Sequence, residues 1–104
     1  MKLISVEEMQ ELSKLEGVQL VDVRTPSEYN DGHIAKSQNI DFWSPEFNQN
    51  IDGLDKSKPV IVYCKSGGRS AKCAAKLKEK GFKKIYDLDG GFLKWIFEGM
   101  PVVK

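Results

Sequence analysis

The chain has 104 residues, of which 40% are hydrophobic and 30% charged, as expected of one globular domain with a single core. Its 16 basic and 15 acidic side chains leave a formal net charge of +1, which argues against nucleic acid or an anionic membrane surface as the main partner. No apolar run approaches the roughly 18 residues that a membrane-spanning helix needs. We therefore predict one soluble domain over residues 1–104.

The N-terminus and the cysteine content indicate a compartment and a class of site. Glu7 and Glu8 come too early for a secretory signal peptide, so we expect a cytoplasmic protein if the first methionine is the natural start. The cysteines, Cys64 and Cys73, and the single histidine lack the spacing of a zinc site, and a chain of this size needs no disulfide. We expect neither a metal nor a cofactor.

Helix-start signals and short apolar runs alternate along the first part of the chain. Ser5–Glu8 is a capping box, and Gly17 lies past the end of the helix that it predicts. Leu20–Val23 then predicts a short strand. Thr25–Glu28 is a second capping box, with proline at the first helical position. The order is that of strands alternating with helices.

The middle of the chain continues this alternation. Asn39–Asp41 predicts a weaker strand, and the Ser-Pro sequence in Ser44–Glu46 predicts a further helix start. Val60–Tyr63 is the most apolar run and predicts the central strand. A helix is expected over Ser70–Lys80, with Gly81 as its stop.

The last part of the chain predicts one more strand and one more helix. The strand is expected over Ile85–Leu88 and the helix over Gly91–Phe97, while Leu3–Ile4 and Val102–Val103 can add pairing at an edge. We expect one apolar face on this helix, formed by Phe92, Leu93, Ile96 and Phe97. Strands that alternate with helices in this way indicate an α/β domain with a mostly parallel sheet.

The loop after the central strand carries the strongest chemical signal. Its residues are Cys64, Lys65, Ser66, Gly67, Gly68 and Arg69. Sites in open α/β sheets form beyond the carboxyl ends of the strands, so Arg24, which follows another strand, is expected at the same rim. Loop amides and a helix N-terminus bind anions, and together with neighbouring cations they favour the nucleophilic thiolate form of cysteine. We predict a reactive Cys64 thiolate inside an anion-binding loop.

Each residue of this loop has a structural alternative. Cys64 could be an inert buried thiol, and Gly67 and Gly68 could form an ordinary tight turn instead of a loop with inward-facing amides. Arg69 could bind a donor anion or hold the loop by pairing with a carboxylate. Lys65 could meet an anionic donor or stay solvated. Ser66 and Ser70 can each donate a hydrogen bond to the site or cap a helix, and Ser70 fits a cap better. Cys73 is expected in the core, and Asp22 and Arg24 as a polar pair that ties the rim together.

Three segments, taken together, resemble the rhodanese domain family in order and spacing. Val21–Ile34 is similar to its N-terminal signature, Val60–Ser70 to its active-site segment, and Leu88–Trp95 to its closing motif. The resemblance implies a five-stranded, mainly parallel sheet flanked by helices on both faces. It also implies sulfurtransferase chemistry, in which sulfane sulfur moves from a small anionic donor such as thiosulfate to Cys64. The resulting persulfide passes its sulfur to cyanide, to a thiol, or to a sulfur-accepting protein.

Two further features bear on this resemblance. Lys36 stands where the family usually has glycine, and lysine in a left-handed conformation would cost on the order of 1 kcal/mol. Phosphatases of related fold have five residues between cysteine and arginine, whereas four separate Cys64 from Arg69 here. A phosphatase would also need a general acid, for which Asp22, Asp41 and Glu28 are the candidates. The alternatives to a sulfurtransferase are a rhodanese-like relay or binding module with little turnover and, less well supported, a cysteine-dependent phosphatase.

Overall fold

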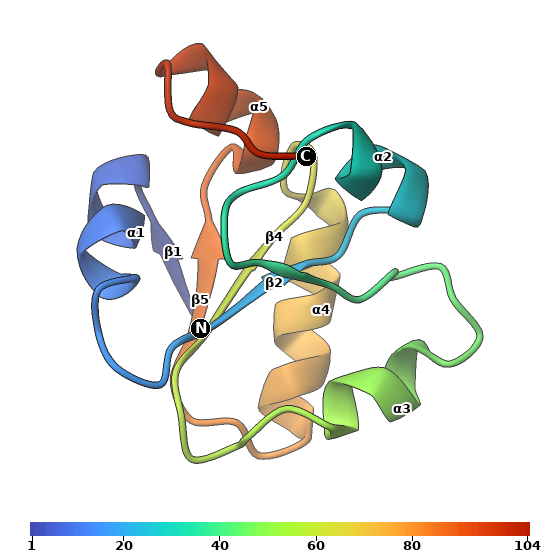
Figure 1. Cartoon of the computed structure of the whole chain (residues 1–104). Coiled ribbons are helices and arrows are strands. Elements are labelled where there is room, and N and C mark those ends of the chain that lie inside the picture. The colour runs from blue at the N-terminus through green and yellow to red at the C-terminus, as the bar shows by residue number, and fades with distance from the viewer.

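A computed structural model describes all residues, 1–104, as one α/β unit (Figure 1). The strands are β1 (Lys2–Ile4), β2 (Gln19–Asp22), β3 (Gln38–Asn39), β4 (Val60–Tyr63) and β5 (Ile85–Leu88). The helices are α1 (Val6–Leu12), α2 (Pro26–Asp31), α3 (Phe47–Asp52), α4 (Gly68–Glu79) and α5 (Gly91–Phe97). No helix has the length and apolar character to cross a membrane.

The five strands form one sheet in the order β1-β5-β4-β2-β3, and every pairing between them is parallel. The central strand β4 is buried along its whole length, as the continuous apolar run Val60–Tyr63 predicts for a strand covered on both faces. The predicted fold class and sheet are therefore confirmed. An isolated antiparallel bridge between His33 and Val103 adds the pairing expected near the C-terminus.

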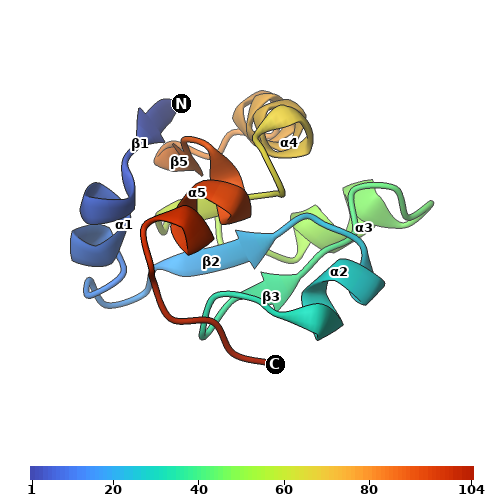
Figure 2. The ribbon, with the colours of Figure 1, turned by 90° about the horizontal axis from the view of Figure 1, so that it is seen from above.

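Helices cover both faces of the sheet, with α1 on one side and α3 and α4 on the other (Figures 1 and 2). The core is divided accordingly. One cluster joins residues of α3 and α4, such as Ile51 and Leu77, to the sheet. The other joins Met9 of α1 and Trp95 of α5 to the opposite face. Both predicted capping boxes are present, so α1 and α2 begin where the sequence places them.

Three predictions about helices need correction. The helix expected from Ser44 begins at Phe47, because the Ser44 hydroxyl accepts a hydrogen bond from the Glu46 amide in a turn before the helix. Helix α4 begins at Gly68, two residues earlier than expected. In α5 only Phe92 of the predicted apolar face is buried, whereas Leu93, Ile96 and Phe97 are exposed, and Trp95 takes the inward position.

Lys36 adopts φ +69°, and it is the only residue other than glycine with a positive φ. The turn after α2 therefore has the left-handed conformation at Lys36 that a glycine at this position would suggest. A lysine can take this conformation, but it does so at a cost that glycine avoids.

Candidate active site

Cys64 lies at the carboxyl end of the central strand β4, and its side chain is held between two polar groups. The Gly67 amide donates a hydrogen bond to Cys64 Sγ over 3.0 Å, and the thiol donates to Ser70 Oγ over 3.4 Å. Cys64 is 1% exposed. The sulfur thus sits under the loop, with one backbone amide directed at it and one hydroxyl oxygen that accepts from it. The amide can stabilise a negative charge on sulfur.

The two loop glycines differ in what they contribute. Gly67 has φ +125°, a conformation that L side chains rarely adopt, and this conformation directs its amide at Cys64. Gly68 begins α4 without a positive φ, and a Cβ on it would meet no atom within 4 Å. The conformational argument made from the sequence for both glycines therefore holds only for Gly67.

Of the two roles predicted for Ser70, the helix cap was favoured. This prediction is wrong, because Ser70 does not cap α4. The N-cap position belongs to Gly67, and Ser70 is a buried residue of the first turn. Its hydroxyl donates to the Gly67 carbonyl over 3.2 Å while it accepts from Cys64 Sγ. Ser70 therefore joins the nucleophile to the loop backbone, and the sequence signal for it was a serine at the start of the helix after the cysteine loop.

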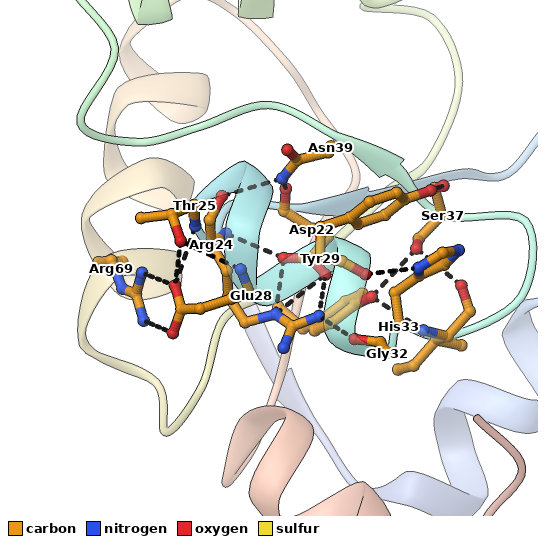
Figure 3. Close-up of polar contacts among 12 residues, drawn as sticks. Asp22, Arg24, Thr25, Glu28, Tyr29, Gly32, His33, Ser37, Asn39 and Arg69 are labelled. Carbon is orange, nitrogen blue, oxygen red and sulfur yellow. Dashed lines mark hydrogen bonds and ion pairs between the residues drawn. The ribbon is translucent and has the colours of Figure 1, made fainter. Parts of the chain in front are cut away.

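Arg69 is directed at a carboxylate (Figure 3). Its guanidinium donates to Glu28 Oε1 over 2.7 Å and to Glu28 Oε2 over 3.1 Å. The Arg69 hydrogen bonds hold the pKa of Glu28 down at about 2, even though partial burial of the carboxyl raises it. Of the two roles open for Arg69, the structure places the side chain in the one that holds the loop by pairing with a carboxylate.

Arg24 is part of the same rim, and it forms the predicted buried pair with Asp22 (Figure 3). Its guanidinium donates to both Asp22 carboxylate oxygens, the closest contact being 2.6 Å, and to the Gly32 carbonyl over 2.7 Å. It also lies 4.2 Å from the centroid of the Phe92 ring. Through these contacts the Arg24 side chain links β2 to the end of α2 and to α5.

Lys65 and Ser66, by contrast, form no hydrogen bond to the sulfur. Both residues are exposed, and Lys65 forms no ion pair. A shallow cavity of about 180 Å³ adjoins the loop, with Lys65, Arg24 and Leu93 in its lining. A larger cavity, about 510 Å³, lies elsewhere, between α1 and the segment after α5. Among the loop residues predicted for the site, only Gly67 hydrogen-bonds the cysteine sulfur, and Ser70 at the start of α4 is its other partner.

Helix α5 supports the loop through a contact that was not foreseen from the sequence. Its first amides donate to the loop carbonyls, Phe92 to Cys64 over 2.8 Å and Leu93 to Lys65 over 3.0 Å. Gly91 has φ +58°, and a Cβ there would lie 2.5 Å from the Cys64 carbonyl oxygen. Consecutive glycines after a strand were the available signal, because they permit a close approach between backbones.

The three carboxyls considered as the general acid of a phosphatase each have another partner in the structure. Asp22 is fully buried against Arg24, and the low pKa of Glu28 keeps that carboxyl ionised at neutral pH. Asp41 accepts a hydrogen bond from the Trp43 amide in an exposed turn.

Cys73 is 0% exposed in the core, as predicted. No cluster of three or more histidine, cysteine or carboxylate side chains forms a metal-binding group.

Comparison with known protein families gives one match over nearly the whole chain. The family described as rhodanese-like domain matches residues 5–98. The protein YqhL of Bacillus subtilis is 40% identical over 77 residues, which are 74% of this chain and 60% of that protein. The thiosulfate sulfurtransferase GlpE of Shewanella oneidensis is 35% identical over 98 residues, covering 90% of this chain and 91% of that protein.

The fold is also similar to that of solved structures. A crystal structure of a rhodanese-related protein from Thermoplasma volcanium superposes with a TM-score of 0.87 and 35% sequence identity, covering 99% of this chain and 98% of that one. The similarity in sequence and the similarity in fold therefore lead to the same family.

Proposed function

Because this chain belongs to the rhodanese-like domain family, whose relatives include sulfurtransferases, we propose that it transfers sulfane sulfur through a persulfide on Cys64. The observation that carries the proposal is the placement of the Cys64 sulfur between the Gly67 amide and the Ser70 hydroxyl at the end of the central strand. We propose thiosulfate as donor, cyanide or a thiol as acceptor, and residues 1–104 as one functional domain.

In the first step the Cys64 thiolate attacks the outer sulfur of thiosulfate. A bond forms between the two sulfurs, the bond between the outer sulfur and the sulfonate sulfur breaks, and sulfite leaves with that electron pair. Lys65 is exposed and unpaired beside the loop, so its ammonium group can attract the doubly charged donor. Since Cys64 is 1% exposed, the proposed reaction requires a local opening of the loop before the donor reaches the sulfur.

In the second step a thiophilic acceptor takes the outer sulfur of the persulfide. The acceptor forms a bond to that sulfur, the sulfur–sulfur bond breaks, and the electron pair returns to Cys64 as a thiolate. The hydrogen bond from the Gly67 amide stabilises the negative charge that returns to the cysteine. No histidine base is required, because the acceptor attacks sulfur and Cys64 leaves as a thiolate that needs no proton.

Mass spectrometry of the intact protein tests the proposal directly. Incubation with thiosulfate is expected to add the mass of one sulfur atom, and cyanide is expected to remove it as thiocyanate. Cys64→Ser is expected to show no gain, while Cys73→Ala, the matched control at the other cysteine, gains the sulfur as the unmodified chain does. Absence of the gain in the unmodified chain, or its persistence in Cys64→Ser, would contradict a Cys64 persulfide.

Turnover separates the enzyme from the relay module. An enzyme of the proposed kind produces thiocyanate continuously from thiosulfate and cyanide. A relay module forms the persulfide but passes its sulfur efficiently only to a partner thiol, so steady-state production of thiocyanate is negligible. The same persulfide on Cys64 underlies both outcomes, and only the steady-state rate distinguishes them.

A further inference from the structure

Asp87 of strand β5 is a buried carboxyl to which neither the fold nor the proposed reaction assigns a role. It is 1% exposed, and its Oδ1 atom has no hydrogen-bond partner. A buried polar atom without a partner costs on the order of 1–3 kcal/mol, so its presence calls for an explanation. Both neighbours of Asp87 in the strand are hydrophobic, Tyr86 and Leu88, as is usual for this part of a sheet.

The sheet register places Asp87 on the same face as the cysteine. Asp87 pairs with Val62 of β4, and side chains of paired residues in a sheet point to the same face. Val62 packs in the core cluster that contains Cys64, Cys73 and Ile85, beneath α4. Ile85 is two residues before Asp87 and therefore shares its face. The Asp87 carboxyl thus lies below the N-terminal half of α4.

Ser70 is hydrogen-bonded to the nucleophile and lies near this carboxyl. Its hydroxyl accepts the Cys64 thiol hydrogen bond, at 3.4 Å, from the first turn of α4. Burial raises the pKa of Asp87 to about 6, while the nearby Ser70 hydroxyl lowers it and the like charge of Asp89 raises it. The hydroxyl hydrogen of Ser70 is directed at the Gly67 carbonyl, over 3.2 Å, and rotation about the Cβ–Oγ bond can turn it toward Asp87.

We propose that Asp87 is a positioning residue for Cys64: the carboxyl and the thiol share one proton through the Ser70 hydroxyl, so that a single negative charge resides on either oxygen or sulfur. This inference deepens the proposed sulfurtransferase function and rests on it, because that reaction begins with a thiolate at Cys64. The unpartnered Oδ1 is then the acceptor for the proton that Cys64 releases before it attacks the donor.

The transfer conserves atoms and charge. The S–H bond of Cys64 breaks as an O–H bond forms on Ser70, and the hydrogen that Ser70 carried forms a bond to Asp87 Oδ1. A carboxylate and a thiol become a carboxylic acid and a thiolate, so no net charge enters the core and no oxidant is required. In a pair that shares one proton, a negative charge on one group disfavours ionisation of the other.

Few other groups face Asp87. Asp89 lies just after the end of β5 and is exposed, Cys73 contributes a thiol from α4, and Leu3 is the register partner from β1. Burial, with the charge of Asp87, raises the pKa of Cys73 to about 12, so Cys73 stays a neutral thiol and does not compete for the proton. The shared proton therefore has two exchange partners, Asp87 and Cys64.

The pH dependence of Cys64 alkylation by iodoacetamide, with the label located by peptide mapping, tests the coupling. Asp87→Asn removes both the charge and the proton acceptor, so the half-maximal alkylation rate is expected at a pH lower by about 1 unit. Glu16→Gln is the control, since it removes an equal charge from an exposed position and is expected to leave the profile close to that of the unmodified chain. A profile of Asp87→Asn that superimposes on the unmodified one would overturn the proposal.

The reciprocal measurement uses carboxyl ¹³C NMR of Asp87 and does not depend on folding of the Asn variant. In the unmodified chain the Asp87 signal is expected to shift a second time over the pH range in which Cys64 becomes reactive. Cys64→Ser is expected to leave a single step, because coupling between two sites is reciprocal. An identical Asp87 titration in both chains overturns the sharing, and an unchanged second step in Ser70→Ala excludes the hydroxyl as its route.

These results are independent of the persulfide assay. If Asp87 and Cys64 are coupled but thiosulfate adds no sulfur, the sulfurtransferase proposal fails and the shared proton stands as a property of the site. If sulfur is added and the coupling is absent, the function stands and the role of Asp87 fails.

Discussion

Glu28 in α2 and Arg69 in α4 are 41 positions apart in the sequence and are joined by two hydrogen bonds of 2.7 and 3.1 Å. The same carboxylate accepts the Thr25 amide over 2.9 Å, completing the cap of α2. One side chain therefore connects the start of α2 to the first turn of the helix that follows the cysteine loop. Figure 3 shows these contacts beside the Asp22–Arg24 pair.

Glu28→Gln is expected to destabilise the fold in a pH-dependent manner. The ordinary pKa of 4.5 for glutamate falls to about 2 for Glu28 in the folded chain. The stabilisation from its charge is therefore fully present above pH 4.5 and is lost as the pH falls through about 2. Because the carboxyl is 30% exposed, we expect about 1 kcal/mol at neutral pH rather than the full value that the shift implies.

Urea unfolding across this pH range measures the effect. The difference between the unmodified chain and Glu28→Gln should shrink as the pH falls. Glu11→Gln is the control, since Glu11 pairs with Lys14 on the surface, where ion pairs contribute little. A difference that is independent of pH would show that the Glu28 charge does not stabilise the fold.

Gly91→Ala is expected to disturb the cysteine loop itself. The new Cβ would lie 2.5 Å from the Cys64 carbonyl oxygen and 2.7 Å from that of Lys65, so α5 or the loop must move. We expect persulfide formation with thiosulfate to slow at least tenfold, because the loop that positions the nucleophile is displaced.

Gly99→Ala separates this contact from backbone strain. Gly99 also has a positive φ, +74°, but no atom lies within 4 Å of its Cβ position. It is expected to lower stability by about 1 kcal/mol while persulfide formation proceeds at the normal rate. Equal rates of persulfide formation in the two variants would contradict a special role for Gly91.

The sequence predicts the strands well because their signals are local. The apolar run Val60–Tyr63 is the observed β4, and Ile85–Leu88 is the observed β5. The capping boxes of α1 and α2 are likewise formed by residues three apart. The start of α3 was misplaced because a serine before proline can also form a turn, and here the Ser44 hydroxyl bonds the Glu46 amide.

The contacts around the site were harder to predict because they join distant segments. Glu28 was considered only as part of a capping box and as a possible acid, because nothing in the sequence indicates Arg69 as its partner. Asp87 was assigned only to a strand, because its burial depends on α4 packing over that face. The pair Asp22–Arg24 was foreseen because the two residues flank the end of one strand.

Lys36→Gly is expected to stabilise the protein. Lys36 has φ +69°, which costs an L residue on the order of 1 kcal/mol, and glycine adopts this conformation without that cost. The greater flexibility of glycine in the unfolded chain offsets part of the gain, leaving roughly 0.5 kcal/mol. Thermal unfolding measures the difference. Lys36→Ala removes the same side chain but keeps the strain, so a comparable gain in that variant would attribute the effect to the lysine side chain instead of its backbone.

Cys64 and Cys73 are both buried, yet they are expected to react very differently. Burial is the main cause that raises the pKa of Cys73 to about 12, and this thiol is 0% exposed in the core cluster beneath α4. Cys64 lies under a loop whose residues Lys65 and Ser66 are exposed. At mildly alkaline pH, iodoacetamide should therefore label Cys64 at least tenfold faster than Cys73 in the folded chain, because the reagent reacts with an accessible thiolate.

Peptide mapping after a timed exposure to the reagent measures the two rates. Both cysteines should react at similar rates in urea, where neither is buried, which provides the control within one sample. Cys73→Ala should leave persulfide formation on Cys64 intact at a modest cost in stability, since it removes only a buried sulfur. Comparable labelling of both cysteines in the folded chain would contradict the burial of Cys73, and loss of the persulfide in Cys73→Ala would make it a participant in sulfur transfer.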